Sequence, residues 1–273
     1  MNRETSLKRE TPVESQTQFN INYMKMNIEA KIDINLQKII IDMMCLTDGK
    51  IIVVERFGTV NIFSSDGKLQ KQLPITGEAR SITQINENTI AITYHNEKAI
   101  KIINMENETV TKVFKLDKVC SGLSFSNNNL AVGLDDNEIR MIDLEGNTVN
   151  SIQVESKSTL FILVYCNNKI IYLDYLDGAV YCYDESGKQI WRYTQDLSSP
   201  YGLCTDTYGN IIVANYYSNS IVVISKDGQN SKVLISEDDW LVRPQCICFK
   251  HNESSGFICD ERGTYLAKFK LTP

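Results

Sequence analysis

The chain has 273 residues, of which 42% are hydrophobic and 23% are charged, and its formal net charge is −6. This composition excludes a disordered or collagen-like chain, and no apolar run reaches the ~18–20 residues that a membrane-spanning helix needs. The acidic balance also disfavours a general binder of polyanions.

The N-terminal residues 1–27 are polar, with Pro12 as their one strong turn signal, and they predict a flexible tail or the remnant of a linker. They contain no apolar core of a secretory signal, so we expect a cytoplasmic protein with no membrane partner. The eight cysteines include no C-x-x-C pair, which argues against a zinc ribbon or a thioredoxin-like motif. In a reducing compartment we expect them to be buried thiols.

Turn signals recur along the rest of the chain. One series is spaced by about 40 residues and is marked by Gly67, Asn107, Gly146, Gly187 and Gly228. A second series of Asp-Gly and Asn-rich turns lies between these marks, and both favour tight antiparallel reversals. The runs between turns have five to eight residues and are rich in Ile, Val and Tyr, which is typical of strands. Each period therefore predicts four short strands.

Four-stranded units repeated at this spacing predict an all-β fold, namely a six-bladed β-propeller of four-stranded antiparallel blades. We expect the inner strands to begin near residues 39, 79, 119, 159, 200 and 244. The fourth strand of each unit alternates more in polarity, as expected at an outer rim, where we also place Trp191.

The sixth unit lacks a fourth strand, because its third strand, near 263–270, is followed at once by Pro273. Residues 29–35 alternate polar and apolar side chains, the pattern of a half-buried edge strand. We therefore predict that 29–35 supplies the missing strand and closes the ring, with Lys31 and Asp33 facing solvent. The propeller then occupies residues 28–273.

The fifth unit resembles the NHL repeat, and the matching residues are Pro200, Gly202, Asp206, Gly209, Asn210, Val213, Ala214, Asp227 and Gly228. Asn215 replaces the aspartate that is usual at that strand end, and the signatures of WD and kelch repeats are missing. Over about residues 29–273, the chain looks like the C-terminal propeller of tripartite-motif proteins of the NHL class. The resemblance implies a substrate-recognition module of a ubiquitin-ligase-like system. Any ligase activity would need a RING domain, which this sequence lacks, as it lacks a B-box and a coiled coil.

In a propeller of this strand order, the loops from second to third strands and the connections between blades share one face. They contain fifteen acidic and nine basic residues, which predicts an acidic face. The candidate binding residues in them are Arg56, Phe57, Tyr94, His95, Asp174, Tyr175, Tyr216, Tyr217, Trp240, Arg243 and Arg262. Tyrosine and arginine are enriched at interaction hot spots, so the expected partner is another protein or a peptide, and a basic segment would suit the charge.

Two other functions stay open at this point. The tyrosines could stack the bases of single-stranded RNA, although such binding needs a basic surface for the phosphates. Six-bladed propellers also include tunnel-metal enzymes of the lactonase or lyase type. The starts of the inner strands contain no carboxylate, and the two histidines, His95 and His251, fall in different blades. We therefore predict no catalytic residue, no metal and no cofactor.

Four residues occupy equivalent positions at the ends of second strands, namely Glu55, Asp174, Asn215 and Asp260. One interpretation is that these four side chains form a ring of metal ligands. A short acceptor at such a place more often bonds the backbone N–H groups of the following turn. We expect that structural role for them.

Overall fold

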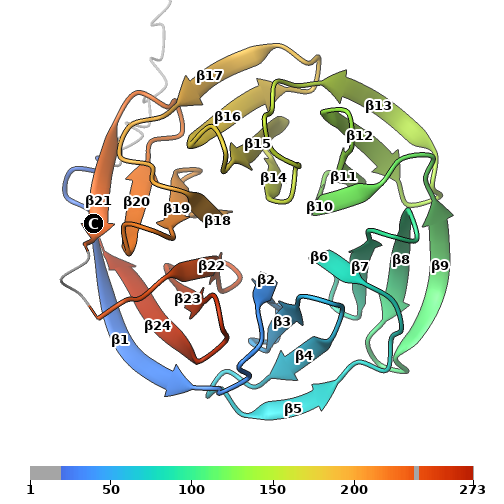
Figure 1. Cartoon of the computed structure of the whole chain (residues 1–273), viewed down its shortest axis with the longest axis horizontal. Coiled ribbons are helices and arrows are strands. Elements are labelled where there is room, and N and C mark those ends of the chain that lie inside the picture. Colours follow the sequence, from blue (N-terminus) through green and yellow to red (C-terminus); the bar gives the residue numbers. More distant parts are fainter. Residues whose placement is uncertain (1–19, 237–239, 273) are drawn as a thin grey trace, which may run out of the picture.

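The computed structural model of the chain describes residues 20–236 and 240–272. Within these ranges the regular elements are all β-strands, and they form six four-stranded antiparallel sheets around a central axis (Figure 1). The fold is a six-bladed β-propeller, so the predicted fold class is confirmed.

Each of the first five blades consists of four consecutive strands, running from the axis to the rim. Blade 1 contains β2 (Ile40–Cys45), β3 (Ile51–Glu55), β4 (Val60–Phe63) and β5 (Leu69–Gln72). Blade 2 contains β6 (Ala79–Asn86), β7 (Thr89–Tyr94), β8 (Ala99–Asn104) and β9 (Thr109–Lys115). Blade 3 contains β10 (Cys120–Ser126), β11 (Asn129–Leu134), β12 (Glu138–Asp143) and β13 (Thr148–Gln153).

The next two blades continue the pattern. Blade 4 contains β14 (Leu163–Cys166), β15 (Lys169–Asp174), β16 (Ala179–Asp184) and β17 (Gln189–Tyr193). Blade 5 contains β18 (Pro200–Thr205), β19 (Ile211–Asn215), β20 (Ser220–Ile224) and β21 (Ser231–Ile235). Five of the six inner strands begin close to the predicted positions, and β14 is the exception.

Blade 6 is assembled from both ends of the described chain. It contains β22 (Pro244–Phe249), β23 (Ser255–Asp260), β24 (Tyr265–Thr272) and, at the rim, β1 (Lys25–Asp33). β1 pairs antiparallel with β24 and aligns Ile32 with Leu266, and Figure 1 shows these two strands side by side. The closure of the ring by an N-terminal strand is therefore confirmed.

The closing strand is shifted from the predicted range of 29–35. It ends at Asp33 because the chain soon turns away, with a left-handed backbone at Asn35 (φ 47°). It starts at Lys25 because Met24 and Met26 are buried in the core between blades 5 and 6. Residues 25–27, predicted as part of the tail, thus belong to blade 6. The predicted tail residues 1–19 lie outside the described part of the chain.

Neighbouring blades are joined by apolar cores. Among the described residues there are six clusters of buried side chains, one at each boundary between adjacent blades. Every residue of β3 and of β20 is buried, because each of these strands is covered on both faces. In the outer strand β9, Phe114 is the one buried side chain, as expected at a rim.

A repeated contact explains the glycines of the turns between third and fourth strands. An apolar side chain from the outer strand of one blade lies against the glycine of the next blade. The pairs are Phe114 with Gly146, Ile152 with Gly187, Trp191 with Gly228, and Ile32 with Gly67. A Cβ at Gly228 would lie 2.6 Å from Cδ2 of Trp191, so a larger residue would not fit. Trp191 is 7% exposed, and its predicted packing at the rim is confirmed.

Blade 4 begins later than predicted because its first residues pack on blade 3. Leu160 is 1% exposed and fills the space beside Gly122 and Gly133, which have no side chains. Its carbonyl oxygen accepts a hydrogen bond of 2.8 Å from the backbone N–H of Gly122. The segment therefore stays outside β14, and the following residue, Phe161, is directed to the central axis, where it lines a cavity.

Candidate binding site

One face of the propeller collects the loops that the sequence analysis singled out, and we call it the loop face. It comprises the loops from second to third strands and the connections between blades. Backbone hydrogen bonds join the two sets, for example from Arg56 N–H to the Ile39 carbonyl (2.7 Å) and from Tyr216 N–H to the Ser199 carbonyl (3.1 Å). These bonds hold the start of each loop beside the entry to its own blade.

A cavity of about 440 Å³ lies at the axis on this face, and we call it the central cavity. Every blade contributes to its lining, from Arg56 in blade 1 through Arg80, Ser121, Tyr175 and Tyr201 to Gln245 in blade 6. Its volume falls within the range of about 300–1,000 Å³ that is usual for ligand pockets. The site therefore exists only when the ring is closed.

Five aromatic side chains line one side of the central cavity, and we call them the aromatic arc. They are Phe161, Tyr175, Tyr201, Tyr216 and Tyr217. Their successive ring centroids are 6.4, 5.5, 5.4 and 5.0 Å apart, all within the range of favourable ring contacts. Tyr217 is 70% exposed, so the arc reaches from the cavity to the surface.

The cavity wall formed by blades 1 and 2 carries two guanidinium groups. Arg80 forms an ion pair of 2.8 Å with Glu78, and its Nε is buried without a hydrogen-bond partner in the described structure. Arg56 is exposed, and its guanidinium carbon lies 5.4 Å from the ring centroid of Phe57. Within residues 20–236 and 240–272, Arg56 makes no ion pair.

Glu261 is the one carboxylate among the described lining residues, and its charge is already engaged. It accepts a hydrogen bond of 2.6 Å from the hydroxyl of Tyr216 and lies 3.4 Å from Nη1 of Arg243. Burial and this hydrogen bond raise the pKa of Tyr216 to about 12. Tyr216 therefore remains a protonated donor at neutral pH, and Glu261 stays fixed against it.

The structure brings four of the predicted binding residues together in the central cavity, namely Arg56, Tyr175, Tyr216 and Tyr217. Arg243 lies beside them, with its guanidinium carbon 5.6 Å from the ring centroid of Tyr216.

Three further predicted residues remain on the loop face but outside this lining. Phe57 is 77% exposed, and Arg262 is exposed as well. His95 is half-buried, and its Nδ1 lies 3.3 Å from both the carbonyl oxygen of Cys120 and the hydroxyl of Ser121.

Two predicted binding residues lie outside the central cavity and pack against neighbouring side chains. Tyr94 is fully buried, because it is the last residue of β7 and points into the core between blades 1 and 2. Trp240 packs edge-on against Tyr265 at 5.6 Å, and Lys31 Nζ lies 5.0 Å from its ring centroid. Trp240 thus belongs to the outer side of blade 6 and is remote from the lining of the central cavity.

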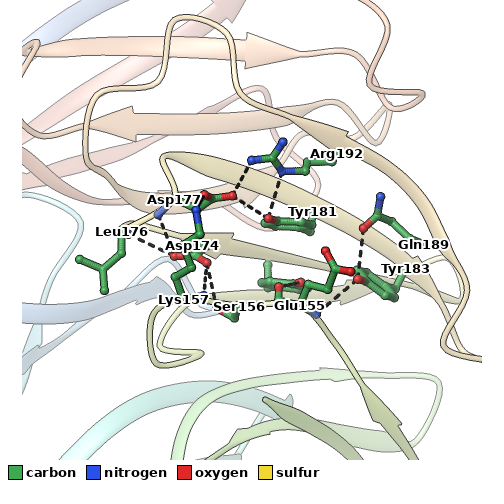
Figure 2. A network of polar contacts seen from close by, with 11 residues as sticks. Glu155, Ser156, Lys157, Asp174, Leu176, Asp177, Tyr181, Tyr183, Gln189 and Arg192 are labelled. Carbon is green, nitrogen blue, oxygen red and sulfur yellow. Dashed lines mark hydrogen bonds and ion pairs between the residues drawn. The ribbon is translucent and has the colours of Figure 1, made fainter. Parts of the chain in front are cut away.

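Asp174 is also fully buried and organises the loop of blade 4 (Figure 2). Its Oδ1 accepts hydrogen bonds from the backbone N–H groups of Leu176 (3.1 Å) and Asp177 (3.0 Å), and its Oδ2 accepts one from Lys157 (2.5 Å). Burial by itself would raise the pKa of Asp174, but these hydrogen bonds outweigh it and hold the pKa below the ordinary value. Its predicted role in the turn is confirmed, and its full burial leaves no exposed surface of this side chain for a partner.

The acidic charge predicted for the loop face is partly neutralised by bases on the strands, which the loop count omitted. Lys101 on β8 pairs with Glu97, Arg140 on β12 with Asp117, and Arg192 on β17 with Asp177. Figure 2 shows Arg192 reaching Asp177 from the outer strand of blade 4. The lining of the central cavity has a different balance, with Arg56 and Arg80 beside a single carboxylate, Glu261.

The described residues include no group of three or more His, Cys, Asp or Glu side chains placed to hold a metal ion. They also include no helix long and apolar enough to span a membrane.

Sequence reasoning missed several lining residues. Arg80, Ser121, Tyr201 and Gln245 each follow the first residue of an inner strand. That shared position is a signal that could have found them. Phe161 carries no such signal, because its place depends on the packing of Leu160 against blade 3.

No family model matches the chain, and no curated protein matches it by sequence. Among solved structures, the chain is similar to the β-propeller domain of Cps50 (Swd1) from Myceliophteria thermophila, with a TM-score of 0.65 and 7% identity. The match covers 90% of this chain and 100% of that domain. At this identity the likeness concerns the propeller fold alone, so the resemblance to NHL repeats stays a prediction.

Proposed function

We propose that the chain is a noncatalytic interaction module that binds a segment of another protein at the central cavity. The observation that carries the proposal is a cavity lined by all six blades, with the aromatic arc on one side and Arg56 and Arg80 on the other. Tyrosine and arginine in a desolvated pocket are the residues that most often dominate the binding energy of protein interfaces. The loops around the cavity are held by strands on both sides, so the site is largely preformed.

The resemblance to tripartite-motif proteins suggests a setting for this role. In such a protein, the propeller would recognise the substrate of a ubiquitin-ligase-like assembly. All eight cysteines lie within the described residues and are free thiols, in keeping with a reducing compartment such as the cytoplasm.

A selection of peptides tests the proposal. A random peptide library displayed on phage is panned on the immobilised chain, and the selected peptides are then titrated by fluorescence polarisation. We expect Tyr175→Ala and Tyr217→Ala to weaken binding by about tenfold or more, as for hot-spot aromatic residues. Leu176→Ala is the matched control, because Leu176 is 63% exposed on the same loop as Tyr175 and lies outside the cavity lining.

Equal binding by the wild type and both tyrosine variants would overturn the choice of site. A single-stranded RNA of random sequence serves as a parallel probe. If the RNA binds, loses affinity in the tyrosine variants and weakens steeply with salt, the cavity is an RNA site and the proposal is wrong. Thermal melting of each variant separates loss of binding from loss of fold.

A further inference from the structure

The two guanidinium groups of the central cavity, those of Arg56 and Arg80, have N–H donors without a hydrogen-bond acceptor in the described structure. A guanidinium carries five N–H donors. Arg80 uses Nη2 for Glu78, and its buried Nε has no partner in the described structure. Arg56 forms no hydrogen bond through its side chain to any described residue. Because Nε is shielded from solvent, an acceptor that enters the cavity binds the remaining N–H groups of Arg80 and those of Arg56.

The carboxylates near these arginines are occupied. Glu78 is the partner of Arg80, and Glu261 is held by Tyr216 and Arg243. Glu55, at the start of the loop that carries Arg56, is buried and accepts a hydrogen bond of 2.7 Å from Asn61. Among the described lining residues, Arg56 therefore offers an unpaired positive charge and no carboxylate is unpaired, which selects an anion.

The aromatic arc adds a second requirement, for a flat ring. The rings of Tyr175 and Tyr201 are stacked, with 22° between their planes. At the inner end of the arc, the guanidinium carbon of Arg80 lies 6.0 Å from the ring centroid of Phe161. A ligand can therefore contact a ring of the arc and a guanidinium group at the same time.

We infer that the central cavity takes an acidic residue, aspartate or glutamate, that is adjacent in its peptide chain to an aromatic residue. The carboxylate pairs with Arg56 and Arg80, and the ring packs on the aromatic arc. This inference rests on the proposed function and names the chemistry of its partner segment. It is opposite in charge to the basic segment favoured by the count of loop residues.

Four short peptides with blocked ends test the inference by fluorescence polarisation. The first has aspartate followed by phenylalanine at its centre, and the other three replace the aspartate by asparagine, the aspartate by lysine, or the phenylalanine by alanine. We expect the asparagine and alanine peptides to bind about tenfold or more weakly than the first, and the lysine peptide to bind least. Higher salt should weaken the first peptide more than the asparagine peptide.

Two variants locate the effect. Arg56→Gln should remove most of the difference between the aspartate and asparagine peptides, because Arg56 is exposed in the cavity and can be replaced without disturbing the core. Arg262→Gln is the matched control, an exposed arginine of the loop face outside the cavity lining, and should preserve the difference. Melting temperatures verify that both variants are folded.

The outcomes separate the inference from the proposed function. If the lysine peptide binds as well as the aspartate peptide, the inference is wrong and the cavity remains a peptide site. The same holds if peptides selected from the library bind at the arc but carry no acidic residue. If neither the designed nor the selected peptides depend on the arc, the proposed function fails as well.

Discussion

The contact between Trp191 and Gly228 allows the packing between blades to be measured. Gly228 lies in the turn between β20 and β21 with φ 73°, and a Cβ there would lie 2.6 Å from Cδ2 and 2.7 Å from Cγ of Trp191. The left-handed backbone costs an alanine roughly 1–2 kcal/mol. Overpacking against the indole adds typically about 1–3 kcal/mol. Gly228→Ala should therefore lower the free energy of unfolding by about 2–5 kcal/mol.

Gly49 supplies the matched control. It has a similar φ of 83°, but a Cβ at this position would meet nothing within 4 Å. Gly49→Ala should therefore lose only the backbone contribution, about 1–2 kcal/mol. Urea unfolding followed by far-UV circular dichroism gives both values.

A double-mutant cycle then isolates the packing term. In a Trp191→Leu background, the smaller side chain leaves room for the new methyl group, so Gly228→Ala should cost about as much as Gly49→Ala does in the wild type. Equal losses for the two alanine variants in the wild type, or no relief in the Trp191→Leu background, would refute the packing argument.

Three further predictions concern the contacts that hold the ring together. Burial raises the pKa of Asp42 to about 6, although hydrogen bonds from Ser81 and Ile82 act to lower it. The folded state therefore holds this proton more tightly than the unfolded state does. Protonated Asp42 stabilises the fold fully below about pH 4, and this stabilisation is lost as the pH rises through about 6. When unfolding midpoints are measured over a series of pH values, the decrease of the midpoint between about pH 4 and 6 should be smaller for Asp42→Asn than for the wild type. The same decrease in both proteins would contradict this prediction. A chain without residues 1–35 lacks the strand that pairs with β24, so it should not unfold cooperatively. Adding a synthetic peptide of residues 20–35 should restore the cooperative unfolding transition. A peptide with the same residues in scrambled order should not. The Sγ atoms of Cys45 and Cys248 lie 3.1 Å apart, so diamide, which takes up the two thiol hydrogens, should join blades 1 and 6 by a disulfide. Mass spectrometry of the linked peptides checks this, and a Cys45→Ser chain that gives the same loss of thiols would count against it.

Only some of the residues that line the central cavity could be predicted from the sequence. Tyr175, Tyr216 and Tyr217 could be predicted because they follow second strands, whose ends are marked by turn residues. Tyr94 follows the same rule and is nevertheless buried, because it is still part of β7, whose last residue faces the core. A shift of one residue along a strand reverses the side to which a side chain points, and the sequence does not locate strand ends to that precision.

The sequence by itself determined the ring of six blades. Turn residues at a period of about 40, strands that are apolar on both faces, and an alternating segment at 29–35 are all properties of short stretches of chain, and they suffice for six blades and their closure. The tertiary structure alone decided the site. Phe161 is at the axis because Leu160 fills a gap beside two glycines of another blade. The charge of the cavity differs from the loop count because Arg80 enters the lining from an inner strand, while Arg140 and Arg192 on other strands neutralise loop acids outside it. Such convergence of distant segments depends on register and packing, which no single stretch of sequence contains.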